Sequence, residues 1–292
     1  MVRMSRAATS TTVSERVGRQ LVELACRAPS VDNTQPWRWR LRPDGMDLYA
    51  DHQRQPPGVD PAGRGVVISC GAALHHVQVA ARAMGWASDV RRLPDAAAPA
   101  LLAEVRLSPE APPRSAAGEL AALRDRHTDR RRFTSWPVPD ERLAVLTAAA
   151  RAHGVGAVAL SDSGERFRLE LLVARAQQLQ ARAEAGAATD DGRDIEGSDG
   201  LVVLYAEDDS PEAWLRAGEG LSALWLDAVR SGLSVVPLSH VLEVEETRAG
   251  LRDSVLGGLA VPLVLVRVGW QAISRSQLVP TSRRPLAQVL LP

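Results

Sequence analysis

The chain has 292 residues, of which 45% are hydrophobic, and its 35 basic and 35 acidic residues give a formal net charge of zero. A neutral chain has no overall positive field that would draw it onto nucleic acid or an acidic membrane, so neither partner is expected. The sequence has no run of about 18 apolar residues and no apolar stretch behind its basic N-terminus, which argues against a membrane span or a secretory signal. We therefore expect a soluble, cytoplasmic protein.

The composition is strongly biased, because every basic residue is Arg and Asn33 is the only asparagine. Such a bias is typical of a GC-rich genome, in which Arg replaces Lys wherever either will serve. The two cysteines, Cys26 and Cys70, fall within helical apolar patterns. Two cysteines cannot form a disulfide framework or a four-ligand zinc site, so we expect buried free thiols and no metal.

The first predicted element is an amphipathic helix over residues 12–27. Thr12 and Glu15 have the spacing of a capping box, and apolar residues follow at helical intervals until Pro29 ends the pattern. A hairpin that turns at residues 43–45 comes next. A largely apolar helix closed by Gly85 and a strand near residues 103–107 complete this half of the chain.

The second half repeats this order of elements. The segments that echo the first half are a helix at 140–153 that ends at Gly154, the string LYAE at 204–207 against LYAD at 48–51, a helix at 218–232 against 71–85, and a strand at 266–268 against 105–107. Each echo is weak alone, but four in the same order indicate an internal duplication.

The mixture of long helices and short buried strands predicts an α+β fold around one shared core, not a doubly wound parallel sheet. We expect an N-terminal tail at 1–12, a first half at 13–112 and a second half at 113–292, packed intimately together. No Gly-x-Gly-x-x-Gly follows a strand, so a Rossmann dinucleotide site is unsupported. The loop expected at 161–167 has too little glycine for a phosphate loop.

The two copies differ most at two segments, and these are the candidate functional regions. Only the first half has an amide-rich loop, in which Ser30, Asn33 and Gln35 lie between Pro29 and Pro36. Hydroxyl and amide groups on a restrained backbone suit the edge of a flat heterocycle, although a structural turn capped by Asn would look the same.

Only the second half has a basic segment, residues 124–133. Arg126, Thr128 and Arg130 alternate, so in an extended chain they would point the same way and could hold a phosphate. A solvated arginine-rich loop is the alternative. Two further segments, the C-terminal stretch with Arg283 and the strand-like exit at 235–240, could equally be an exposed tail and a buried connection.

Taken together, four motifs resemble the flavin-dependent nitroreductase superfamily. They are APSxxNxQPW, RHTxRR followed by Phe, GxGLSALWLDAVRSGLSVVPL and a terminal SRRPL, and the likeness runs from about residue 15 to the end. The chain is most similar to the Acg-like actinobacterial branch, whose single chains look like fused nitroreductase dimers. The resemblance implies a nitroreductase-like pseudodimer.

The resemblance also implies one FMN site between the two halves. On that basis the segment around His127 and the C-terminal arginine would bind the phosphate, the amide-rich loop would meet the ring or the ribityl chain, and the 237–239 exit would lie along the ring face. The implied cofactor-binding residues are Pro29, Ser30, Asn33, Gln35, Arg126, His127, Thr128, Arg130, Pro237, Leu238, Ser239 and Arg283. The chain departs from the pattern where Thr281 replaces a common Lys and Ser239-His240 replaces a common Glu-Gly.

The implied activity moves two electrons from NAD(P)H through FMN to a small nitro, quinone or other organic acceptor. No side chain need act as a nucleophile; His240 and His127 are the candidate proton donors, and each could also be an ordinary packed or exposed histidine. The alternative is a flavin-sequestering protein, as the Acg-like branch suggests. Residues 182–200 are shorter than the lid of Acg-like relatives, which predicts an open flavin face, and the fused chain is expected to act as a monomer.

Overall fold

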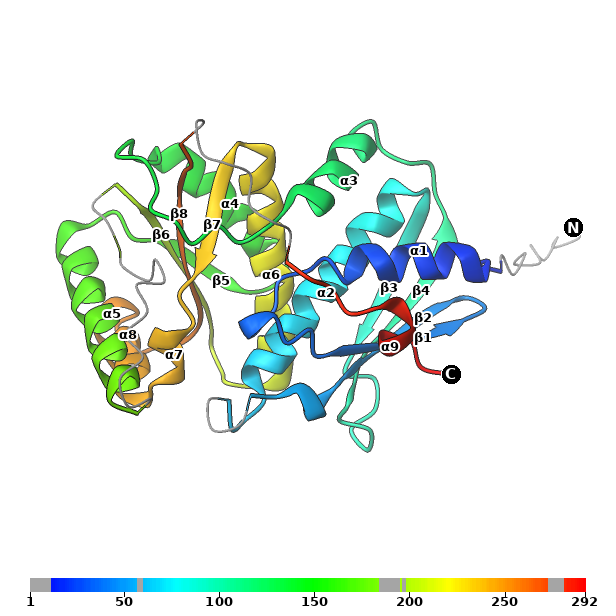
Figure 1. Cartoon of the computed structure of the whole chain (residues 1–292), viewed down its shortest axis with the longest axis horizontal. Helices are drawn as coiled ribbons and strands as arrows, with labels where there is room; N and C mark the ends of the chain where they lie inside the picture. The colour runs from blue at the N-terminus through cyan, green and yellow to red at the C-terminus, as the bar shows by residue number, and fades with distance from the viewer. Residues whose placement is uncertain (1–11, 57–59, 184–194, 196–197, 273–280) are drawn as a thin grey trace, which may run out of the picture.

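The computed structural model describes residues 12–56, 60–183, 195, 198–272 and 281–292. It is an α+β structure in which two four-stranded antiparallel sheets lie on either side of a central pair of long helices (Figure 1). The first half contains α1 (Glu15–Ala25), β1 (Trp37–Arg42), β2 (Gly45–Ala50), α2 (Arg64–Ala83), β3 (Trp86–Arg92) and β4 (Leu101–Pro109). The second contains α4 (Asp140–Arg151), β5 (Gly156–Ala159), β6 (Gly200–Ala206), α6 (Pro211–Arg230), β7 (Leu233–Pro237) and β8 (Val261–Trp270).

The predicted duplication is confirmed by the topology of the two sheets. Their strand orders are β1-β2-β4-β3 and β5-β6-β8-β7, so each strand of the first half has a counterpart in the second. The register shifts at the same place in both, between Leu48 and Tyr49 and between Leu204 and Tyr205. The remaining helices are additions to the repeat: α3 (Ala116–Asp125), α5 (Ser163–Ala183), α7 (His240–Glu243), α8 (Glu245–Val255) and α9 (Leu286–Val289).

The halves meet where α2 and α6 cross at two glycines. A Cβ on Gly71 would lie 2.1 Å from the carbonyl oxygen of Leu215, and one on Gly218 would lie 2.0 Å from that of Ile68. Gly71 and Gly218 are 147 positions apart, as are Ile68 and Leu215, so the two contacts are related by the internal repeat. The crossing therefore marks an approximate twofold axis between the halves.

The apolar interior is divided, which corrects the expectation of one shared core. One cluster fills the first half, around Trp37 and Trp39, and includes Leu215 from α6. A second lies in the second half around Trp225 and includes Ile68 from α2. A third lies under α5, α7 and α8. The two central helices thus each contribute residues to the core of the opposite half.

Two local expectations were wrong, and one strand was not predicted. The N-cap of α1 is Ser14, whose Oγ accepts from the Val17 N–H at 3.4 Å, so Thr12 and Glu15 do not form the expected capping box. Strand β3 was missed. Residues 163–167, expected in a loop, form the first turn of α5.

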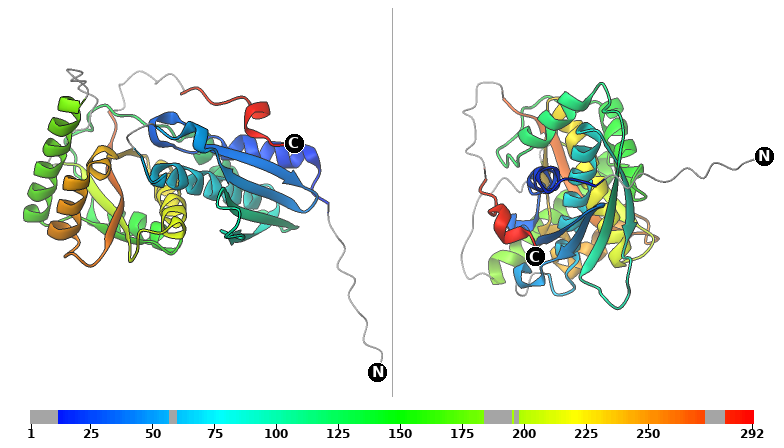
Figure 2. Two further views of the ribbon diagram at one scale, coloured as in Figure 1. Left: turned by 90° about the horizontal axis from the view of Figure 1, so that it is seen from below. Right: turned by 90° about the vertical axis from the view of Figure 1, so that its right-hand side faces the viewer.

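The C-terminal segment returns from the second half to the first. Figure 2 shows residues 281–292 beside α1 and the β1–β2 hairpin. The Leu291 N–H donates to the Trp39 carbonyl at 2.7 Å, and Leu290 forms a bridge with Trp39. Among the described residues, no helix is long and apolar enough to cross a membrane.

The helix crossing yields a stability prediction. Gly71→Ala and Gly218→Ala should each destabilise the protein by roughly 1–3 kcal/mol, because the added methyl group must displace a main-chain carbonyl. Gly118→Ala is the matched control, since a Cβ at that helical position meets nothing within 4 Å, and it should stabilise by about 0.5–1 kcal/mol. Urea unfolding measures all three, and equal effects at the three sites would contradict the close crossing.

Candidate functional site

The amide-rich loop of the first half has an unusual backbone. Asp32, Asn33 and Gln35 all have positive φ, at 48°, 54° and 50°. Such conformations are uncommon for residues other than glycine, and Asp and Asn tolerate them best. The Ser30 hydroxyl accepts from the Gln35 N–H at 3.0 Å and closes the loop. The loop is therefore held in one conformation, as a ligand-binding turn requires.

Asn33 connects this loop to the C-terminal arm, residues 281–285. Its Nδ2 donates to the Ser282 carbonyl at 3.1 Å, and its Oδ1 accepts from Arg283 Nη1 at 3.1 Å. The Arg284 N–H donates to Gln35 Oε1 at 2.8 Å, so a second amide holds the same arm. An Asp at position 33 could not donate to a carbonyl, and this gives the only asparagine of the chain a specific role in placing Arg283.

Two arginines from distant parts of the chain converge on one carbonyl. Arg126, at the C-terminal end of α3, donates to the Arg27 carbonyl at 3.0 Å through Nη2 and at 3.3 Å through Nε. Arg283 Nη2 donates to the same oxygen at 3.3 Å. The guanidinium of Arg126 also lies over the Trp225 ring, 4.8 Å from its centroid. We call Arg27, Arg126 and Arg283 the arginine cluster.

The arginine cluster carries uncompensated positive charge. Burial, together with Arg283 and Arg27, lowers the pKa of Arg126 to about 9, and burial and Arg27 lower the pKa of Arg283. Arg126 Nη1 and Arg283 Nε are buried without a hydrogen-bond partner in the described part of the chain, where no carboxylate forms an ion pair with either side chain. Since a buried cation without a counter-charge is costly, the cluster is suited to an anion.

The side chains of the basic segment do not point the same way, contrary to the prediction. Arg126 is buried, Thr128 is half-buried and Arg130 is exposed, so the three side chains are not equivalent members of one face. His127 is also exposed, with Nδ1 2.7 Å from the Asp125 carbonyl oxygen. The buried Asp129 carboxylate accepts from the Arg131 side chain at 2.6 and 2.8 Å, which neutralises that arginine.

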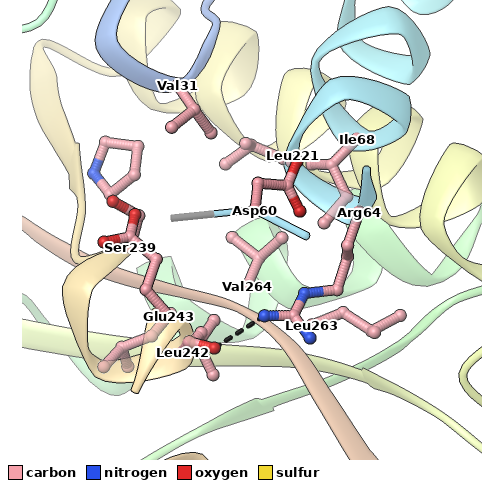
Figure 3. A pocket seen from close by; sticks show the side chains of 13 residues that line it. Val31, Asp60, Arg64, Ile68, Leu221, Ser239, Leu242, Glu243, Leu263 and Val264 are labelled. Carbon is pink, nitrogen blue, oxygen red and sulfur yellow. Dashed lines mark hydrogen bonds between the residues drawn. The ribbon is translucent and has the colours of Figure 1, made fainter. Parts of the chain in front are cut away.

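An open pocket lies between the two halves (Figure 3). Its empty volume is about 580 Å³ when the open solvent at its mouth is counted. Apolar side chains form most of its wall. The lining residues are Val31, Asp60, Arg64, Gly65, Ile68, Leu221, Pro237, Ser239, Leu242, Glu243, Leu263, Val264 and Leu265.

The exit from β7 forms the second-half wall of this pocket. Pro237 ends the strand and has no N–H, and the Leu238 N–H is already engaged by the Leu265 carbonyl at 2.8 Å. Ser239 and Glu243 are the polar residues that the second half contributes to the lining. Figure 3 shows Arg64 across the pocket from Ser239, with its Nη2 donating to the Leu242 carbonyl at 2.6 Å.

The pocket and the arginine cluster are neighbours because one loop reaches both. Val31 lines the pocket, while Asn33, two residues further on, binds Arg283 of the cluster. Two residues of extended chain span at most about 7 Å. An elongated ligand could therefore place a flat apolar group in the pocket and an anionic group on the arginines.

The first-half position that is related by the repeat to the pocket residue Ser239 holds an arginine in an ion pair. Arg92 is the counterpart of Ser239 at the 147-residue spacing, but β3 continues through Arg92, whereas β7 ends at Pro237. The Arg92 guanidinium donates to both carboxylate oxygens of the fully buried Glu219, at 2.7 and 2.8 Å, and Gln78 donates to one of them at 2.8 Å. This network occupies the first-half position that is related by the repeat to Ser239.

The structure brings many of the predicted site residues together. Pro237 and Ser239 line the pocket, and Asn33 of the amide-rich loop binds Arg283, which forms the arginine cluster with Arg126 and Arg27. Arg130 and His127 are exposed, and His240 is buried in α7, outside the pocket lining. Sequence reasoning missed Arg27, Val31 and Arg64. Most of the expected lid at 182–200 lies outside the described residues. Cys26 and Cys70 are buried free thiols, and burial raises the pKa of Cys26 to about 12.

A duplicated α+β chain with a pocket lined by both halves is the architecture of a fused pseudodimer. No family model matches the sequence. Two Mycobacterium tuberculosis proteins are similar over almost the whole chain. The one named "Putative NAD(P)H nitroreductase Rv3131" is 34% identical over 93% of this chain and 90% of its own. The one named "Putative NAD(P)H nitroreductase acg" is 30% identical over 96% of each. The chain belongs to the nitroreductase family, in the branch that includes Acg.

Solved structures show more distant similarity over about half of the chain. A nitroreductase with bound FMN from Bacteroides fragilis is 16% identical and covers 56% of this chain and 93% of its own, with a TM-score of 0.45. A nitroreductase with bound FMN from Desulfitobacterium hafniense is likewise 16% identical over 56% and 93%, with a TM-score of 0.41.

The charge of the arginine cluster predicts a specific anion effect. Sulfate should raise the melting temperature more than chloride does at equal ionic strength, because it supplies the missing counter-charge. Arg126→Gln should reduce this difference to the general stabilisation that sulfate gives through exclusion from protein surfaces, while Arg168→Gln, at an exposed position on α5, should leave it intact. An undiminished difference in Arg126→Gln would show that the anion does not bind at the arginine cluster.

The same effect should depend on pH. Since the folded-state pKa of Arg126 is about 9 and its ordinary value is 12.5, the folded protein binds fewer protons between those values. This group should therefore make the sulfate-free protein more stable as pH rises through that window. Sulfate needs the charged guanidinium, so the extra stabilisation by sulfate should decline above pH 9. Melting curves with and without sulfate across this range test both trends. A sulfate-free stability that does not rise with pH would contradict the first, and a pH-independent sulfate effect would contradict the second.

Proposed function

We propose that the chain is an FMN-binding oxidoreductase that moves two electrons from NAD(P)H to a small nitro, quinone or other organic acceptor. The observation that carries this proposal is the juxtaposition of an apolar pocket with buried Arg126 and half-buried Arg283, neither of which pairs with a carboxylate of the described residues. An FMN molecule combines a flat ring with a phosphate about one ribityl chain away. The similarity to proteins named NAD(P)H nitroreductases supports the same conclusion.

The residues present fit the cofactor at both of its ends. At the phosphate end, Arg126 Nη1 and Arg283 Nε are buried donors with free hydrogen-bonding capacity. Arg27 adds a third charge, and Thr128 and Arg130 are close in sequence to Arg126. At the ring end, the pocket offers Val31 from one half and Pro237 from the other as apolar contacts. Bound FMN would supply the hydride and electron transfer chemistry.

The protein residues would then act by binding, orientation and exclusion of water. The apolar wall of the pocket shields a flat ring on one side, and the Ser239 hydroxyl is available as a hydrogen-bond donor where relatives often have Glu-Gly. The Leu238 N–H is engaged within the sheet, so it is not free to bind a ligand. Asn33 acts on the cofactor through Arg283, which it holds in place. His127 and His240 remain candidates for the proton donor.

The fusion makes one chain sufficient for one site. Loop and arm come from opposite ends of the sequence and already meet within the chain. The Arg92–Glu219 pair fills the repeat-related position. We therefore expect one FMN per chain and activity as a monomer.

A second candidate function is storage or sequestration of flavin without turnover. The loss of one of two sites and the replacement of Glu-Gly by Ser239-His240 favour it. Both functions predict a flavin complex, and they differ in whether a nicotinamide reduces it.

Anaerobic titration with NADPH or NADH separates the two functions. We expect the yellow absorbance of one FMN per chain to bleach on addition of reductant and to return when a nitroaromatic or quinone is added. A complex that contains FMN but is reduced by neither nicotinamide would establish the sequestering function instead. Protein that cannot be loaded with FMN would contradict both.

The arginine cluster should determine the affinity for FMN. Arg126→Ala and Arg283→Ala should each weaken binding by about 1.5–3 kcal/mol, the range for hydrogen bonds to charged groups. Fluorescence quenching of FMN measures the change, with Arg168→Ala on α5 as the exposed control. Unchanged affinity in both variants would show that the cluster is not the phosphate site.

A further inference from the structure

Arg267 is a buried arginine that contacts the backbone of the basic segment. It lies on β8 with 1% of its surface exposed. Its Nη2 donates to the carbonyl of Arg130 at 2.8 Å and is 3.3 Å from that of Arg131. Its Nη1 is 3.6 Å from Asp199 Oδ2, which supplies the counter-charge. One guanidinium therefore ties two successive peptide groups of the segment to the second sheet.

Phe133 of the basic segment also packs against β8. The guanidinium carbon of Arg267 lies 4.5 Å from the centroid of its ring. The ring packs against Gly269 so closely that a Cβ there would be 2.1 Å from a ring carbon. The Thr134 N–H donates to the Trp270 carbonyl at 2.8 Å. Residues 130–134 are thus docked on β8 by a stacked arginine, an aromatic ring and a main-chain hydrogen bond.

The basic segment needs such support because it has no regular secondary structure. Residues 126–139, between α3 and α4, contain neither helix nor strand, so no ladder of backbone hydrogen bonds fixes their path. At the N-terminal end, Arg126 is held by the Arg27 carbonyl and the Trp225 ring. At the other end, Arg267 is a polar anchor, since it donates to the Arg130 carbonyl. A displacement of the carbonyls that it binds would shift the residues between the two anchors.

We propose that Arg267 is a positioning residue for anion binding, which holds the basic segment so that its donors face the phosphate of FMN without touching that phosphate itself. The inference rests on the proposed function for the identity of the anion. Because the phosphate end of the site depends on Arg267 and the ring end does not, its loss should discriminate between flavins with and without a phosphate.

The test compares FMN with riboflavin, which has the same ring and no phosphate. Arg267→Lys keeps a charge opposite Asp199 but loses the planar fork that can bind two carbonyls and stack on Phe133. Its affinity for FMN should fall roughly tenfold, equivalent to about 1.4 kcal/mol, while its affinity for riboflavin stays within about twofold. Phe133→Leu removes the stacking and keeps the arginine. It should also lower the affinity for FMN relative to the affinity for riboflavin. Arg92→Lys, at the ion pair between β3 and Glu219 of α6, is the matched control and should change neither affinity.

Sulfate stabilisation provides a readout that does not depend on flavin. The increase in melting temperature caused by sulfate should be smaller in Arg267→Lys than in the unaltered protein and unchanged in Arg92→Lys. Equal losses of FMN and riboflavin affinity, or an unchanged sulfate effect, would overturn the positioning role. If the unaltered protein responds to sulfate but binds neither flavin, the proposed function fails, and the sulfate comparison still decides whether Arg267 positions the anion site.

Discussion

The close crossing of α2 and α6 at Gly71 and Gly218 is the constraint on which the rest of the structure depends. Each helix brings a glycine against a carbonyl of the other, which is possible only where both residues lack a Cβ. This contact lies on the approximate twofold axis, so it fixes the two sheets at equivalent positions on either side (Figure 1). Ile68 and Leu215 then pack into the apolar cores of the opposite halves, so the core of each half includes a residue from the other half.

The composite site follows from this arrangement. The amide-rich loop precedes α2 and the 237–239 exit follows α6, so the crossing brings them to the same pocket. The C-terminal arm then adds Arg283 from the far end of the chain. The Arg27 carbonyl gathers two guanidinium groups at the C-terminal end of α1, where carbonyl groups are free and the helix dipole favours cations. The shared carbonyl stabilises the two neighbouring positive charges when no ligand is bound. The buried donors Arg126 Nη1 and Arg283 Nε are the groups with which an anion would form hydrogen bonds.

The sequence predicted the parts of this structure that depend on local patterns. Helical periodicity ending at Gly85, Gly154 and Gly232 gave the helices of the repeat, and all three glycines have the positive φ of a helix C-terminus. Strand β3 was missed because it is a half-exposed edge strand with little apolar alternation. The sequence did contain a periodic signal for α5 that was overlooked, since Leu169, Val173 and Ala176 are buried at helical spacing.

The site was predictable as a set of segments but not as a geometry. The motifs named the loop, the basic segment, the exit and the arm. The role of Asn33 depends on a contact between residues 250 positions apart, and that of Arg27 depends on a main-chain carbonyl, which no side-chain pattern reveals. Arg267 was overlooked for the same reason, because its contacts with the basic segment include the carbonyl groups of Arg130 and Arg131.

Fusion of the two halves explains why the site can be asymmetric. In a symmetric dimer of identical subunits, any change that improves one site is copied into the other. In a single chain the counterparts are separate residues, so position 239 can remain a small Ser beside a pocket while position 92 becomes an Arg that binds a buried Glu219. A buried, hydrogen-bonded ion pair contributes little net stability but is costly to break. Once formed, such a pair would keep the first-half position closed, and only the other site would remain free to bind a ligand.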